Sequence, residues 1–370
     1  MSTETAEIVE KPTDTTTKST KKTPPTKAKK GKKPNKKITA LVLQGGGALG
    51  AYEYGVIKAL YENSDFNPDI ICGVSIGGFS AAVIGGAKDG PVAGLEQLWQ
   101  MFTAENMPFV PHAMQVLMTM PYNPGMYIPN YSAMANPLST TNFFDTKPLY
   151  NTLNKIIDFD KLNSPEAPNV VITATSIEKG IAEPFNNRMM EITDKHIVAS
   201  GSLPPSFPMV EIDGNNYWDG GLFSNTPLKP AFKALEQLAE YEDDTEVIMV
   251  ELFPQVGETP ANMADVIERM GSLIFERKVV FDQKLFERTK NNIDFVQVLD
   301  KELPKDSPLR QAPAFKQLMG YSKIDKLTVI KYKGEENMLG ITDFTEKTIR
   351  RRIELGYQDG LAHLATQTVS

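Results

Sequence analysis

Two short apolar runs, each ending in a glycine-rich loop, constrain the fold of this 370-residue chain more than any other feature. The first run, ITALVLQ at residues 38–44, stops at three glycines, and the second, DIICGVS at residues 69–75, enters the loop GVSIGG. A helix pattern follows each loop, over residues 48–63 and 76–87. Both runs are too uniformly apolar for strands with one wet face, so they predict a mainly parallel sheet covered by helices on both faces.

Later segments continue this alternation of strands and helices. Apolar runs predict strands at residues 169–178 and 246–254, and VEI and NYW around Asp213–Gly214 predict a hairpin whose second arm ends at Asp219. Amphipathic patterns predict a long helix at residues 263–292 and a closing helix at residues 345–364. The chain therefore divides into a tail, an α/β domain and a C-terminal part rich in helices.

Residues 107–145 differ from their surroundings. They are crowded with Met, Pro, Tyr and Phe and show no clean period. A segment rich in flexible apolar side chains can form a flap of the core or a lid over an apolar site. Both interpretations stay open at the level of the sequence.

The formal net charge of −7 is unevenly distributed. Residues 1–37 hold eleven lysines and four acidic residues, so they carry +7 and the remainder carries −14 by difference. We therefore expect no nucleic-acid binding from the folded part. The tail is rich in Lys, Thr and Pro, which predicts a disordered arm. It can solubilise the protein or make peripheral contact with an anionic membrane.

Two further features bear on the compartment. No run approaches 18 consecutive apolar residues, and the first residues lack the basic-then-apolar order of a secretory signal, so we expect a cytoplasmic protein with at most peripheral membrane association. The single cysteine, Cys72, excludes an internal disulfide and a cysteine-rich metal site. Its place in an apolar run predicts a small core residue.

The two glycine loops are the candidate site. The carboxyl ends of parallel strands lie along one edge of a sheet, so both loops should meet there and each should open a helix. Helix N-termini direct unsatisfied N–H groups toward that spot and favour an anion. If Ser75 attacks an ester carbonyl there, the main-chain N–H groups of Gly45, Gly46 or Gly47 can hold the resulting oxyanion.

The first loop also permits a different interpretation. Its sequence GGGALG fits the G-x-G-x-x-G pattern of a dinucleotide-binding unit. Such a unit normally closes its second strand with an acidic residue for the ribose. Here that strand starts at Asp69 and ends in the turn that bears Ser75, which favours ester chemistry.

A serine nucleophile needs a general base, and the chain has three histidines. The order Ser75, Asp219, His363 would match an α/β-hydrolase triad. However, His363 lies in a helix pattern without turn signals, and His112 and His196 are better explained as structural residues. Asp219 in WDGG is the alternative base. Because a free aspartate titrates near ~3.9, it would need burial and a short hydrogen bond to the serine.

Three motifs occur together in a characteristic order: LVLQGGGALGAY at residues 41–52, GVSIGG at residues 73–78 and YWDGGLFSNTPL at residues 217–228. Over about residues 38–255, the chain resembles the patatin-like phospholipase family. The resemblance implies a three-layer α/β/α sandwich with a mainly parallel central sheet and C-terminal helices. It also implies a catalytic dyad that needs neither histidine, metal nor cofactor.

Carried over by motif, the resemblance implies that Ser75 is the nucleophile and Asp219 its general base. It implies an oxyanion hole built by Gly45, Gly46 and Gly47. The implied domains are a patatin-like catalytic domain over residues 38–257, which includes the possible lid or acyl-pocket segment 107–145, and a helical C-terminal extension over residues 258–370, as in bacterial members.

The glycine loop departs from the family pattern at two positions. Many members have Arg or Lys where this chain has Leu49, and Asp or Ser where it has Gln44. The loop therefore has no side-chain cation to help hold a phosphate. We expect a serine acyl hydrolase that acts on fatty-acyl esters of phospholipids or, alternatively, on neutral glycerides or an intracellular polyester such as polyhydroxybutyrate. A non-catalytic lipid-binding or scaffold protein and a dinucleotide-binding enzyme are the alternatives from other classes.

Overall fold

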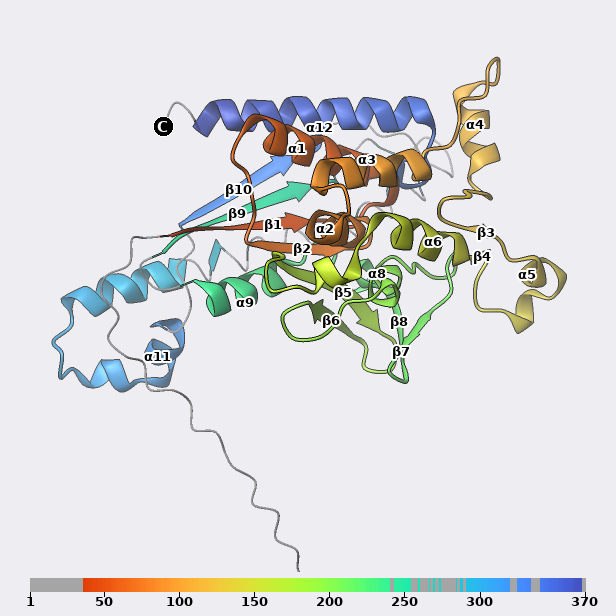
Figure 1. The fold of residues 1–370 in the computed structure, drawn as a ribbon. Coiled ribbons are helices and arrows are strands. Elements are labelled where there is room, and N and C mark those ends of the chain that lie inside the picture. Colours follow the sequence, from red (N-terminus) through yellow and green to blue (C-terminus); the bar gives the residue numbers. More distant parts are fainter. Residues whose placement is uncertain are drawn as a thin grey trace, which may run out of the picture. The chain divides into compact units, whose positions relative to one another are not determined.

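The computed structural model describes residues 36–239, 243–253, 291–319, 325–333 and 340–367, with isolated positions between 259 and 288. Within these residues, a central sheet has helices on both faces (Figure 1). The expected mainly parallel α/β architecture with C-terminal helices is confirmed. Most of the helix expected at residues 263–292 and nearly all of the Lys-rich tail lie outside the described residues.

Eight strands of the described chain form the central sheet: β1 Lys37–Leu43, β2 Ile70–Val74, β5 Asn169–Ser176, β6 Ile181–Asn186, β7 Val210–Ile212, β8 Asn215–Asp219, β9 Asp244–Glu251 and β10 Lys326–Lys331. Their order is β10-β9-β1-β2-β5-β8-β7, and β6 pairs with β5 outside this path. The strands from β10 to β5 are parallel, and β6, β7 and β8 are antiparallel. The glycine loops after β1 and β2 therefore lie at the same edge.

Strand β1 shows why the sheet is covered on both faces. Leu41 and Leu43 belong to one core cluster, whereas Ala40 and Val42 belong to a second cluster on the other face, and all four are buried. Fully burying a Leu or Val side chain contributes about 1.5–3 kcal/mol. A strand with apolar residues at every position is stable only between two covering layers.

Helices from several parts of the chain supply these layers. Those whose side chains join the first cluster are α1 Gly50–Asn63, α2 Ile76–Gly86, α3 Pro91–Phe102, α6 Lys147–Ile156, α7 Phe159–Leu162, α8 Asp194–Ser200 and α12 Glu346–Gln367. Helix α9, Leu228–Leu238, packs against the second cluster. Figure 1 shows α1, α3 and α12 on one side of the sheet and α9 on the other. The closing helix expected near the end of the chain is confirmed as α12.

The C-terminal part contributes a strand as well as helices. Strand β10 lies at the edge of the sheet, parallel to β9, although we expected a helical extension after residue 257. The lysines at its two ends, Lys326 and Lys331, pair with Glu246 and Glu251 of β9 at 2.9 and 3.2 Å. Lysines on a short edge strand are a common protection against pairing with other chains, and here they also obscured the strand pattern. The boundary proposed at residue 257 stays a prediction.

The segment at residues 107–145 contains only short elements. They are α4 His112–Thr119, β3 Ile128–Pro129, α5 Tyr131–Ala135, the 3-10 helix Pro137–Ser139 and β4 Phe144–Asp145. Strands β3 and β4 pair with each other in a separate small sheet. Short elements of mixed type explain why the sequence shows no single period here.

The remaining described elements are four 3-10 helices and one short helix: Gly47–Leu49, Gly220–Leu222, Pro308–Gln311, Gly340–Thr342 and α11 Pro313–Met319. Residues 291–302 are also helical. The first two 3-10 helices follow β1 and β8, at the edge of the sheet that carries Ser75. Cys72 is a buried residue of β2, and burial raises the pKa of its thiol, as expected for a core cysteine.

Candidate active site

Ser75 lies on a sharp turn between β2 and α2. Its backbone angles are φ 53° and ψ −124°, a conformation that a residue with a side chain rarely adopts. Such strain costs roughly 1–3 kcal/mol and persists only where surrounding structure enforces it. The Ser75 N–H donates to Ser200 Oγ at 2.9 Å, and that hydroxyl donates to the Thr173 carbonyl at 2.7 Å. These bonds help hold the turn while Ser75 itself remains half-buried.

Asp219, at the end of β8, reaches this turn. The Ser75 hydroxyl donates to Asp219 Oδ2 at 2.7 Å, and Asp219 Oδ1 accepts the N–H of Gly221 at 2.7 Å. The Asp219 residue is 4% exposed. The carboxylate therefore has one oxygen fixed by the backbone and the other directed at the serine, the arrangement that a general base requires.

The register of β5 explains how residues so far apart in sequence meet. Strand β5 pairs with β2 on one side and with β8 on the other. Its neighbouring residues Thr173 and Ala174 are opposite Val74 and Asp219, respectively. The residue after Val74 and the residue that ends β8 are thereby brought to the same edge of the sheet.

The first glycine loop lies against the serine. A Cβ placed on Gly45 would be 3.0 Å from Ser75 Cβ and 2.5 Å from Asn225 Oδ1, so only glycine fits. The Gly45 carbonyl accepts the Asn225 side-chain amide at 2.9 Å, and the Gly45 N–H makes a long bond of 3.4 Å to the Asn225 carbonyl. Within the described residues, the N–H groups of Gly46 and Gly47 make no hydrogen bond, and both residues are partly exposed. The N–H groups of Gly46 and Gly47 are therefore more accessible to a ligand than that of Gly45.

Gln44 fixes the base of this loop through three buried hydrogen bonds. Its side-chain amide donates to Thr226 Oγ1, its Oε1 accepts the N–H of Leu252, and its own N–H donates to Glu53 Oε1, each at 2.7 Å. These three partners come from three separate parts of the chain. From the sequence, Gln44 stood out only as a departure from the family pattern. The missed signal is a fully buried amide in an apolar run, which must satisfy its polar atoms.

Two other supporting residues, Ser200 and Asn225, were also missed. Ser200 ends α8, and the sequence offered no sign that its hydroxyl would meet the Ser75 backbone. Asn225 lies two residues before Pro227, which immediately precedes α9. Asn225 is 1% exposed and bonds the glycine loop.

The histidines lie elsewhere. His363 interacts electrostatically with Lys37 and Lys326, which begin β1 and β10 at the opposite ends of the strands from Ser75. The triad alternative with His363 is therefore wrong. His196 accepts the Thr193 N–H at 3.0 Å in a capping box of α8, and burial lowers its pKa. His112 is considered below.

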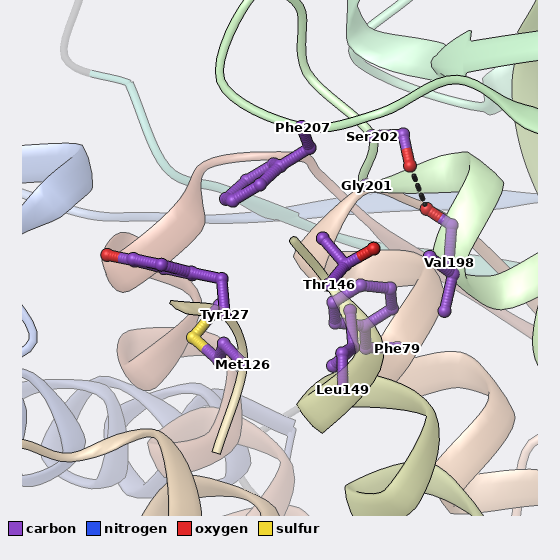
Figure 2. A pocket seen from close by; sticks show the side chains of 9 residues that line it. All are labelled: Phe79, Met126, Tyr127, Thr146, Leu149, Val198, Gly201, Ser202 and Phe207. Carbon is purple, nitrogen blue, oxygen red and sulfur yellow. Dashed lines mark hydrogen bonds between the residues drawn. The ribbon is translucent and has the colours of Figure 1, made fainter. Parts of the chain in front are cut away.

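A small hollow of about 20 Å³, drawn in Figure 2, lies between residues that contact the backbone of Ser75 and of Asp219. Its lining is mostly apolar: Phe79, Met126, Tyr127, Thr146, Leu149, Val198, Gly201, Ser202 and Phe207. Phe79 lies one helical turn after Ser75, and the Ser202 carbonyl accepts the Asp219 N–H at 2.9 Å. Figure 2 shows Met126 and Tyr127 on one side of the hollow, facing Val198. Neither Ser75 nor Asp219 lines the hollow, which is apolar but has room for little more than a water molecule.

Substitution of Gly45 by alanine is expected to lower kcat for ester hydrolysis by about 10²-fold or more, because the new Cβ displaces the loop that supplies the oxyanion donors. Steady-state kinetics of the purified variant with a soluble ester measure this effect. Gly180→Ala is the matched control. The φ of Gly180, 63°, also disfavours a residue with a side chain, but a Cβ there would have no atom within 4 Å. An unchanged kcat for Gly45→Ala would contradict the position assigned to the loop.

Glu53 of α1 is buried in an unusual state. The residue is 0% exposed, and its Oε2 has no hydrogen-bond partner within the described residues. Burial raises the pKa of Glu53 well above its ordinary range, and the bond from the Gln44 N–H lowers it only in part. The folded protein therefore favours the neutral carboxyl.

This state makes the free energy of unfolding depend on pH. The pKa of Glu53 is higher in the folded protein than in the unfolded chain, where it is about 4.3. The resulting contribution to the free energy of unfolding is fully present below the unfolded pKa and is lost as pH rises through the folded pKa. Glu53→Gln keeps an acceptor for the Gln44 N–H without needing a proton. We expect its melting temperature, relative to the wild type, to rise from about pH 5 to about pH 8. Glu62→Gln, at an exposed position of α1, corrects for the lost formal charge, and a difference that does not grow with pH would contradict the neutral carboxyl.

Comparison with known proteins gives one family match. A model of the patatin-like phospholipase family matches residues 41–232, slightly more than half of the chain. No curated protein sequence gives a significant match.

Matches among solved structures include VipD from Legionella pneumophila, at 16% identity and a TM-score of 0.39, covering 90% of this chain and 67% of VipD. They also include the ExoU–SpcU complex of the type III secretion system of Pseudomonas aeruginosa, at 15% identity and a TM-score of 0.31, covering 90% of this chain and 76% of that chain. A structure of the type III effector ExoU matches at 13% identity and a TM-score of 0.31. The match covers 90% of this chain and 54% of the ExoU chain.

Proposed function

The chain belongs to the patatin-like phospholipase family, and on this premise we propose that it is a serine acyl hydrolase that uses Ser75 and Asp219 as a catalytic dyad. Family membership makes it a lipid hydrolase in general terms. The observation that carries the finer proposal is the 2.7 Å hydrogen bond from the Ser75 hydroxyl to Asp219, beside a loop of glycines. The strained turn at Ser75 supports it, because such strain concentrates at functional positions.

The reaction proceeds in two halves. Asp219 takes the hydroxyl proton as Ser75 Oγ attacks the ester carbonyl, and the N–H groups of Gly46 and Gly47 stabilise the oxyanion. The C–O bond to the alcohol then breaks, and the alcohol leaves with the proton from Asp219. Water attacks the acyl-serine while Asp219 accepts its proton, and that proton returns to Ser75 Oγ as the fatty acid is released.

The substrate class follows from the hollow and the glycine loop. The apolar lining of the hollow favours part of an acyl chain over a polar group, which supports cleavage of fatty-acyl esters. Leu49 is 2% exposed and offers no cation to a phosphate. This favours neutral glycerides, or a polyester such as polyhydroxybutyrate, as the alternative substrate.

Membrane contact is a separate part of the proposal. None of the helices in the described part of the chain is both long and apolar enough to cross a bilayer. The Lys-rich tail at residues 1–37 lies almost wholly outside the described residues, so its contact with anionic membranes stays a prediction. The role of residues 107–145 as a lid is likewise part of the proposal, supported by Met126 and Tyr127 in the hollow.

Hydrolysis assays with the full chain test this function. We expect turnover of p-nitrophenyl butyrate, and release of fatty acid from a mixed lipid extract, followed by mass spectrometry, which also identifies the preferred ester. A non-catalytic lipid-binding protein would retain lipids from the extract without releasing acids. Stabilisation by a dinucleotide without any ester turnover would instead support the nucleotide alternative.

A further inference from the structure

One part of the described chain has no charged side chain. Residues 106–144 contain no Asp, Glu, Lys or Arg, although these types make up 23% of the whole sequence. A surface that faces water normally carries interspersed charges of both signs. We call residues 106–144 the uncharged segment, and its position at the surface needs an explanation.

Helix α4 of the uncharged segment turns apolar side chains outward. Met114, Leu117 and Met118 are 50%, 54% and 53% exposed, and their spacing puts them on one face of the helix. The opposite face holds Gln115 and Val116, which are buried. Further exposed apolar side chains of the segment are Phe109, Tyr122, Tyr131, Leu138 and Phe143. Apolar exposure on this scale marks a surface that contacts another apolar phase.

Two polar side chains of the segment, those of Gln115 and Asn123, are directed inward. The Gln115 amide donates to the Val110 carbonyl at 2.8 Å, and the Asn123 amide donates to the Phe102 carbonyl at 2.7 Å. Both residues are at most 9% exposed. These two amides bond to the backbone while Met114, Leu117 and Met118 face outward, whereas a helix packed on a core in water has charged or polar residues on its outer face.

A contact with the C-terminal part holds α4 in this orientation. His112 Nε2 lies 3.0 Å from Asp343 Oδ2, and the Thr348 hydroxyl donates to the same oxygen at 2.6 Å. Asp343 Oδ1 accepts the N–H of Thr345 at 3.0 Å. The first residue of α4 is therefore attached to a fixed group, so the outward apolar face is part of the fold.

The uncharged segment is continuous with the hollow beside Ser75. Met126 and Tyr127 of the segment line the hollow. The Phe143 N–H donates to the Ser206 carbonyl at 3.2 Å, next to Phe207, which also lines the hollow. Figure 1 shows α4, β3, β4 and α5 along one side of the ribbon, outside the helices that cover the sheet. The segment therefore contributes both to the exposed apolar surface and to the lining of the hollow.

We propose that the uncharged segment docks on the surface of an electrically neutral lipid bilayer, with Met114, Leu117 and Met118 inserted among the lipids. This inference rests on the proposed function, because the acyl substrate of a lipid hydrolase lies in such a surface. The absence of Asp, Glu, Lys and Arg lets residues 106–144 approach the acyl chains of a bilayer without moving one of these charged groups out of water. The charge of −14 on residues 38–370 disfavours an anionic surface and leaves a zwitterionic one.

Vesicle sedimentation tests the docking separately from catalysis. The full chain with Ser75→Ala is mixed with phosphatidylcholine vesicles in about 0.5 M NaCl, which screens the Lys-rich tail. We expect it to sediment with the vesicles as well as the wild type does. The double variant Leu117→Glu, Met118→Glu should lower the partition coefficient about tenfold or more, because charged groups must leave water to insert.

Leu238→Glu and Val298→Glu are matched controls, since these apolar residues are 43% and 59% exposed but lie outside the uncharged segment. They should leave sedimentation unchanged, and melting curves establish that every variant is folded. Three results would overturn the docking: no sedimentation of the wild type, binding only to anionic vesicles that high salt abolishes, or a dimer that Leu117→Glu, Met118→Glu dissociates. Vesicle binding without ester hydrolysis would instead reject the proposed function and retain the docking.

Discussion

Ser75→Ala is expected to reduce the turnover of p-nitrophenyl butyrate by at least about 10⁴-fold, as loss of a serine nucleophile does in other hydrolases. The variant lacks the oxygen that forms the acyl-enzyme, while the glycine loop and the hollow remain. The strained backbone of residue 75 is kept, because its N–H still donates to Ser200 Oγ. The melting temperature should therefore change by only about 2 °C or less.

Ser80→Ala is the matched control for this experiment. Ser80 lies in α2, five residues beyond the proposed nucleophile, and is fully buried. Its hydroxyl has no hydrogen-bond partner within the described residues, so its removal should leave both stability and turnover near the wild-type values. If Ser75→Ala retained turnover close to that of Ser80→Ala, Ser75 would not be the nucleophile.

Asp219→Asn is expected to lower kcat by about 10⁴-fold, similar to the loss when an amide replaces the acidic member of a catalytic triad. The amide has nearly the same shape and can still accept the Gly221 N–H, so the turn after β8 should be preserved. It cannot take up the proton of the serine. The loss should therefore appear in kcat, measured by steady-state kinetics, rather than in KM.

Asp213→Asn provides the control for this change of charge. Asp213 lies in the turn of the same hairpin, with φ 49°, a conformation that asparagine adopts readily. Its variant should keep wild-type kinetics. Equal activities of Asp219→Asn and Asp213→Asn would show that another group deprotonates the nucleophile.

Much of the fold could be predicted because the central strands are uniformly apolar. The apolar runs that form β1 and β2 direct side chains to both faces of the sheet, so both faces must be covered by helices. Few other structures bury every side chain of such a run. The hairpin of β7 and β8 followed from the turn at Asp213–Gly214. Strand β10 was missed because its lysines obscure an edge strand whose pairing partner, β9, is distant in sequence.

The candidate site was predictable in its principal residues but not in its support. Ser75 and Asp219 stand in recognisable motifs, whereas their contact depends on the register of β5, which no local pattern encodes. Ser200 and Asn225 act through backbone groups of distant loops, so their residue types alone gave no signal. His363 could be excluded as the general base only from the structure, because it lies near the opposite ends of the strands from Ser75.

Labelling with a fluorophosphonate tests the central claim most directly, because the reagent reacts much faster with an activated serine than with other side chains. Intact mass of the full chain, followed by mapping of its peptides, identifies how many groups attach and where. We predict one group per chain, on Ser75, and labelling that slows strongly in Asp219→Asn. A label on any other residue, or none on the folded wild-type protein, would contradict the proposed dyad.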